Sequence, residues 1–159
     1  MKTNMRKIFG VIACGVIALM LMTSCENGSL NGNVERPSWA PAASTDMTSS
    51  MTAVVKVDLE AQYPGKAKEF VLDKNDLVAA FSGETCLGVA SPNDGLFFLY
   101  IAGPTGPVLD ERQTTNITLR YYSAFYKNLF EAVDVFPFVN DDNKGTADTP
   151  LIPPFVVVR

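Results

Sequence analysis

The chain has 159 residues, a net charge of −4 and no histidine. Its length accommodates one ordinary domain with a short extension, and 47% apolar with 19% charged residues excludes a disordered chain. The acidic balance argues against nucleic-acid binding, because that binding depends on Lys and Arg neutralising phosphates.

The first 24 residues have the layout of a secretory signal. Lys2, Arg6 and Lys7 form a positive segment, and an uncharged apolar run follows over residues 8–22. This run is shorter than the roughly 20 residues that a membrane-spanning helix needs. We therefore predict that residues 1–24 are a signal peptide, with a permanent signal anchor as the alternative.

Cys25 follows this apolar run directly, behind the small residues Thr23 and Ser24. The arrangement resembles a lipobox, in which a diacylglycerol is attached to the cysteine thiol before cleavage. Cys14 also has a lipobox-like prefix, but too few apolar residues separate it from Lys7. We therefore expect Cys25 to carry the lipid, which makes the protein an outer-membrane lipoprotein on the cell surface or the periplasmic face.

Loss of the signal changes the charge and the thiol inventory. Ten of the 13 basic residues would remain against 17 acidic ones, a net charge of −7, with no basic patch for anionic headgroups. Membrane attachment would then depend on the acyl chains. Cys86 would be the one thiol left unmodified, so we expect no internal disulfide and a small core residue at that position.

Residues 25–50 are rich in Asn, Gly, Ser, Thr and Pro and show no strand or helix period. This composition predicts a flexible tether with an end-to-end distance of about 25–30 Å. Trp39 is its one large aromatic residue. We expect Trp39 either to fold back onto the domain or to present a stacking surface for a ligand.

Residues 51–159 consist of short β-type runs separated by turn residues, without a sustained helical period. This pattern predicts an all-β domain, a single antiparallel β-sandwich of about eight short strands. The run over residues 96–102 (LFFLYIA) is apolar on both faces and predicts a central strand. The expected runs are 52–59, 70–72, 77–81, 85–90, 96–102, 108–109, 116–124, 127–133 and 155–158.

Three of these runs resemble a β-sandwich module that recurs in secreted and surface lipoproteins of Bacteroidetes. They are residues 75–81 (NDLVAAF), 86–90 (CLGVA) and 97–101 (FFLYI), and residues 119–122 and 138–141 continue the pattern. The resemblance covers about residues 51–155. It implies the fold and a location in the cell envelope, but no binding residues and no activity.

The absence of histidine argues against catalysis, since acid–base work, nucleophilic triads and most transition-metal sites depend on it. A pair of carboxylates is the remaining route, for glycoside hydrolysis. The possible members, Asp76, Asp94, Asp110 and Glu111, lie at predicted turns, where Asp favours local hydrogen bonds. We predict no enzyme and no cofactor.

An acidic loop over residues 140–148 is the candidate metal site. Asp141, Asp142, Asn143 and Asp148 are oxygen donors of the kind that Ca²⁺ takes. The spacing is not that of an EF-hand, because Lys144 falls at a ligand position. We expect a solvated turn, with a Ca²⁺ site as the alternative.

The aromatic residues Tyr121, Tyr122 and Tyr126 are the candidate ligand contacts, together with Trp39. Neighbouring residues on a strand point to opposite faces, so an outward tyrosine would be available to stack on a sugar. The alternative is that neighbouring segments cover them. The sequence thus favours a non-catalytic binding module for an extracellular glycan or a surface protein.

The second hypothesis is a structural adhesion or assembly component that acts through strand edges. The apolar C-terminal run over residues 155–158 would then be donated to the open edge of a neighbouring molecule. We expect this run instead to pair within its own sheet.

Overall fold

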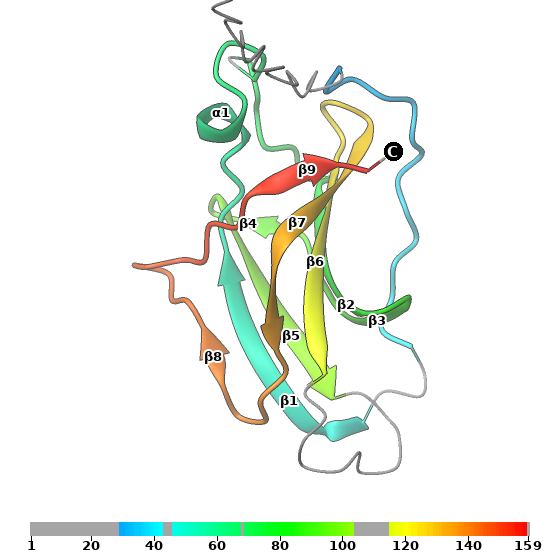
Figure 1. The fold of residues 1–159 in the computed structure, drawn as a ribbon, viewed down its shortest axis with the longest axis vertical. Helices are drawn as coiled ribbons and strands as arrows, with labels where there is room; N and C mark the ends of the chain where they lie inside the picture. Colours follow the sequence, from blue (N-terminus) through cyan, green and yellow to red (C-terminus); the bar gives the residue numbers. More distant parts are fainter. Residues whose placement is uncertain (1–28, 43–45, 68, 104–114, 159) are drawn as a thin grey trace, which may run out of the picture.

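The computed structural model describes residues 29–42, 46–67, 69–103 and 115–158, which form nine strands and one short helix in two facing sheets (Figure 1). The predicted all-β sandwich is therefore confirmed. Cys25 and the predicted signal lie outside the described residues. The elements are β1 (Asp46–Val55), α1 (Leu59–Gln62), β2 (Leu77–Ser82), β3 (Thr85–Ala90), β4 (Pro92–Asn93), β5 (Leu96–Gly103), β6 (Asn116–Ser123), β7 (Asn128–Pro137), β8 (Asn143–Lys144) and β9 (Phe155–Val157).

The first sheet has the strand order β4-β5-β1-β8 and the second the order β3-β2-β6-β7-β9. All named pairs are antiparallel except β1 and β8. The C-terminal run pairs with β7 in its own sheet, as expected. Residues 70–72 form no strand, because this segment belongs to the connection between α1 and β2, and residues 108–109 lie outside the described residues.

The core between the sheets is centred on the buried ring of Tyr121. Phe97 of the first sheet lies 6.1 Å from it, and Phe130 and Phe155 of the second sheet each lie 5.7 Å from it, between ring centroids. Such tilted and edge-to-face pairs add about 0.5–1.5 kcal/mol each beyond the burial of their area. The alternation of apolar residues along each strand therefore places these aromatic side chains together in the middle of the sandwich.

One side of the sandwich is closed where β3 meets β5. A β-bulge displaces β3 relative to β2 between Ala80 and Phe81 and turns Leu87 into the core. Next to it, Gly88 lies so close to the carbonyl of Tyr100 that a Cβ at this position would clash with the backbone of β5. The two sheets approach this closely because residue 88 has no side chain.

Residues 29–42 lie along the second sheet, as the blue and cyan segment beside β2 and β3 in Figure 1. The amide of Gly32 donates to the carbonyl of Tyr126 (2.8 Å), and the amide of Val34 donates to that of Lys127 (2.8 Å). The prediction of a flexible tether is therefore wrong for this segment, which we call the N-terminal strap. The polar composition of residues 29–42 did not predict this packing, because the packing depends on backbone hydrogen bonds to the distant β6–β7 hairpin.

The strap covers the outer face of the second sheet over β2 and β3. Trp39 packs edge-on against Phe81, with ring centroids 5.6 Å apart, in a small apolar cluster that includes Ala79 and Cys86. The prediction that Trp39 folds back onto the domain is thus confirmed. Cys86 is a buried core residue as expected, and burial raises the pKa of its thiol.

Gly32→Ala should loosen the start of the strap. A Cβ at this position would lie 2.7 Å from the carbonyl oxygen of Lys127 and 2.8 Å from Cγ of Asn128, closer than packed atoms approach. We expect a glutamate-specific protease to cut after Glu35 several-fold faster in this variant. An unchanged cleavage rate, followed by mass spectrometry, would show that the strap tolerates the methyl group.

Candidate functional site

Asp76 is buried and accepts three hydrogen bonds from the fold itself. Its donors are the hydroxyl of Tyr121 (2.8 Å), the amide of Ala124 (2.7 Å) and the amide of Asp73 (3.1 Å). Burial raises the pKa of this carboxyl, and the hydrogen bonds oppose that shift. Asp76 therefore joins the start of β2 to the end of β6, which is a structural role.

The other carboxylates considered for hydrolysis do not join Asp76 in a described cleft. Asp94 is exposed in the turn between β4 and β5, where it adopts a left-handed conformation (φ 51°). Asp110 and Glu111 lie outside the described residues. The described part of the chain thus offers no facing pair of these carboxylates.

Tyr121, Tyr122 and Tyr126 are all buried, so the prediction of an outward tyrosine platform is wrong. Around these tyrosines the second sheet is covered by the first sheet inside and by the strap and the β6–β7 hairpin outside. Tyr122 points outward from its strand, but its hydroxyl donates to the carbonyl of Val34 in the strap (3.4 Å). A tertiary cover, invisible in strand alternation, removes these rings from solvent.

The acidic loop is held against β1, and three of its four candidate ligands have side-chain partners within the protein. Asp142 forms an ion pair with Lys144 (2.7 Å), which holds the pKa of that carboxyl below its usual range. The side chain of Asn143 accepts from the hydroxyl of Thr52 (3.1 Å), and the carboxylate of Asp141 accepts from the side-chain amide of Asn140 (3.0 Å). Asp148 is exposed. In the described ranges no three Asp, Glu, Cys or His side chains are grouped to hold a metal ion.

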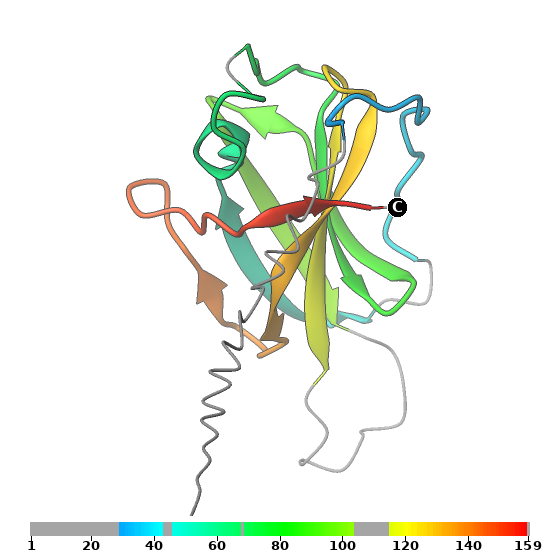
Figure 2. The same ribbon diagram turned by 45° about the horizontal axis from the view of Figure 1, so that its top comes forward.

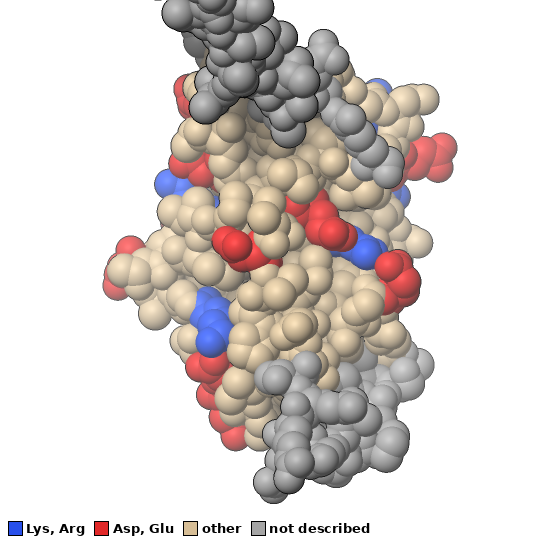
Figure 3. Space-filling model, in the orientation of Figure 1, with Lys and Arg blue, Asp and Glu red and all other residues tan. Residues whose placement is uncertain are grey.

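Charged groups are scattered over the molecule rather than gathered in one field. On the face shown in Figure 3, small groups of acidic and basic side chains lie between wide uncharged areas. Arg120 illustrates this pairing, because it contacts Glu84 (3.1 Å) and Glu131 (2.9 Å) and lies 4.5 Å from the centre of the Phe81 ring. This surface has no charged field that would select a polyanion.

The open aromatic surface lies on the outer face of the first sheet. Along β5, Phe97 and Leu99 are buried, whereas Phe98 and Tyr100 each expose 47% of their surface. The predicted central strand is indeed flanked by β4 and β1, and among the described residues its inner face is buried while Phe98 and Tyr100 on its outer face are exposed. The reason is that a two-layer sandwich leaves the outer face of a sheet to solvent unless another segment covers it.

The strand register places polar and apolar neighbours beside these two rings. Phe98 lies opposite Val54 and Tyr100 opposite Thr52 on β1, and Thr52 in turn lies opposite Asn143 on β8. We call these five residues the β5 face. Side chains two positions apart on a strand are about 7 Å apart, so the rings form one continuous strip on a rigid backbone.

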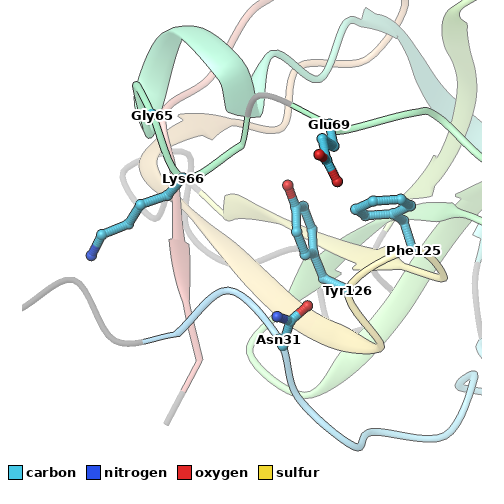
Figure 4. A pocket seen from close by; sticks show the side chains of 6 residues that line it. All are labelled: Asn31, Gly65, Lys66, Glu69, Phe125 and Tyr126. Atoms are coloured by element: carbon cyan, nitrogen blue, oxygen red, sulfur yellow. The ribbon is translucent and has the colours of Figure 1, made fainter.

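A recess of about 360 Å³ lies at one end of the sandwich (Figure 4). The hydroxyl of Tyr126 is directed toward Glu69, with Phe125 beside them, and Lys66 points away. Burial and the negative charge of Glu69 raise the pKa of Tyr126. The strap, the turn after α1 and the β6–β7 hairpin all contribute to this recess. Its lining residues are Asn31, Gly65, Lys66, Glu69, Phe125 and Tyr126.

No family model, curated protein or solved structure matches the chain. The resemblance to Bacteroidetes lipoproteins therefore stays a prediction. Among the described residues, none of the helical structure has the length and apolar character of a membrane span.

Sequence reasoning missed Phe98 and Tyr100 as surface residues. The available signal was a strand that is apolar on both faces within a two-layer fold, where one of its faces is open unless a further segment covers it. The same reasoning could not tell which strand the strap would cover.

Proposed function

We propose that the protein is a non-catalytic binding module of the cell envelope, held to the membrane through Cys25, with the β5 face as its contact surface for extracellular glycan. The observation that carries the proposal is the pair of neighbouring exposed rings, Phe98 and Tyr100, on one rigid strand. Aromatic faces contact the C–H faces of sugar rings without needing charge.

The polar groups beside the rings favour a neutral, hydroxyl-rich ligand. Thr52 supplies a hydroxyl and Asn143 an amide, and these two side chains are already hydrogen-bonded to each other (3.1 Å). Such groups donate to and accept from sugar hydroxyls while their mutual hydrogen bond holds them in place. The acidic net charge of the protein does not oppose a neutral glycan.

The envelope location is supported by the signal-like leader, the lipobox-like sequence at Cys25 and the resemblance to Bacteroidetes lipoproteins. The assembly hypothesis has less support, because the apolar C-terminal run already pairs with β7. A protein ligand on the β5 face remains the outcome to be distinguished by experiment.

Phe98→Ala and Tyr100→Ala should each weaken glycan binding about tenfold or more, which corresponds to about 1.4 kcal/mol. The full-length protein would be screened on a glycan array and by electrophoresis through polysaccharide gels. Phe125→Ala is the matched control, because Phe125 is exposed to a similar extent (45%) but lies in the β6–β7 hairpin.

Three results would count against a glycan-binding β5 face. They are unchanged binding in both β5 variants, loss of binding in Phe125→Ala alone, and no binding of any glycan by the intact protein. The last result would favour a protein ligand.

A further inference from the structure

We propose that one end of the sandwich rests on the surface of the phospholipid bilayer, with Phe125 and Val71 in its interfacial region. This end consists of the start of the strap, the connection after α1 and the tip of the β6–β7 hairpin. The inference rests on the lipid anchor at Cys25 that belongs to the proposed function.

Leu30 is fixed to the domain. Only 4% of its surface is exposed, and its carbonyl accepts from the side-chain amide of Asn128 (3.0 Å). Two residues later, the amide of Gly32 donates to the carbonyl of Tyr126 (2.8 Å). The strap is thus attached to the domain from Leu30 onward.

The chain between the lipidated residue and Leu30 is short. Cys25 precedes Leu30 by five residues, and a fully extended chain of that length spans about 17 Å. The lipidated residue is therefore confined near the end of the domain where Leu30 packs. A tether of about 25 residues would have held the domain clear of the headgroups, but the packed strap removes most of that reach.

The start of the strap lies beside the tip of the β6–β7 hairpin, so this end of the domain would face the membrane. Figures 1 and 2 both show the blue start of the strap beside the tip of the β6–β7 hairpin, at the same end as α1 and its following connection. The strap then runs away from this end along the second sheet. The hairpin tip therefore lies nearer the anchor than the rest of the sandwich.

This end of the domain exposes apolar side chains. Phe125 is 45% exposed and Val71 is 65% exposed. Tyr126 joins the two segments that carry them, since its ring contacts Phe125 edge-on (4.9 Å between centroids) and stacks on Phe70 (5.9 Å), the residue before Val71. Exposed Lys127 follows in the hairpin tip. Exposed apolar side chains beside lysine suit the boundary between acyl chains and headgroups.

This placement separates the two candidate surfaces. The recess lined by Phe125 and Tyr126 lies at the membrane end, whereas the β5 face lies on the side of the sandwich. A soluble glycan would therefore reach the β5 face without competing with the bilayer.

Tryptophan quenching tests the orientation in the full-length lipidated protein. In a Trp39→Phe background, Phe125→Trp and Phe98→Trp each carry one reporter at positions of similar exposure. The proteins would be reconstituted into phosphatidylcholine vesicles that contain a headgroup spin-labelled lipid. We expect quenching at position 125 several-fold stronger than at position 98, and equal quenching would overturn the inference.

Two further measurements distinguish the orientation from the anchor. A fatty-acid probe should label the native protein and not Cys25→Ala, and continued labelling of that variant would overturn the anchor and with it the inference. A labelled protein without preferential quenching at position 125 would overturn the orientation alone. A flexible insertion of about 20 residues after Gly28 should preserve the label and abolish the preferential quenching.

Discussion

Asp76→Ala should lower the free energy of unfolding by about 3–5 kcal/mol. The substitution leaves the hydroxyl of Tyr121 and the amides of Ala124 and Asp73 without their shared acceptor. Each buried donor that loses its partner costs about 1–3 kcal/mol. Urea unfolding followed by circular dichroism measures this loss, and a value below about 1 kcal/mol would show that water replaces the carboxylate.

The same carboxyl should also contribute to the pH dependence of stability. Because burial raises the pKa of Asp76, the folded protein binds a proton there more readily than the unfolded chain. Its contribution is therefore fully present below the ordinary pKa and is lost as the pH rises through the raised value. We expect the native protein to gain stability relative to Asp76→Asn as the pH falls from about 7 to about 4, and no change in this difference would contradict the shift. The comparison cancels the opposite contributions of Glu84 and Asp142, whose pKa values are lowered.

Gly88→Ala should destabilise the protein by at least about 3 kcal/mol, or prevent folding altogether. A Cβ at this position would overlap the carbonyl of Tyr100, and the nearest atoms belong to the backbone, which cannot move aside by changing a rotamer. The sheets would have to separate where β3 closes the sandwich against β5. Thermal and urea unfolding of the purified variant provide the measurement.

Gly65→Ala is the control for Gly88→Ala. Gly65 has a φ of +81° and open space around it, so alanine there incurs backbone strain without a clash. We expect a cost of about 1–2 kcal/mol at position 65 and a clearly larger cost at position 88. Equal costs would indicate that the two sheets move apart easily.

Several strands were predictable because the information they need is local. The hairpin predicted over residues 77–81 and 85–90 corresponds to β2 (Leu77–Ser82) and β3 (Thr85–Ala90). The run over residues 96–102 corresponds to β5, and its Asp94-Gly95 turn has the positive φ values that such a turn requires. The alternation of apolar and polar residues and the presence of turn residues are patterns over a few positions, so they can be recognised without knowledge of the fold.

The candidate site was less predictable because exposure depends on distant segments. Tyr122 and Phe98 are both aromatic residues directed outward from their sheets, yet one is buried and the other is open. The difference is the strap, whose Val34 accepts the hydroxyl of Tyr122 across a separation of 88 positions. Strand periodicity specifies the side of the sheet on which a residue lies, but not what covers that side.

The amino-acid sequence by itself determined the all-β class and the position of most strands, since these depend on composition and on short-range patterns. Only the tertiary structure decided that residues 29–42 pack on the second sheet, that Asp76 holds buried donors, and that Phe98 and Tyr100 form the open aromatic strip. Each of these depends on contacts between segments far apart in the chain. Their free energy comes from burial and from hydrogen bonds that exist only once both sheets have formed.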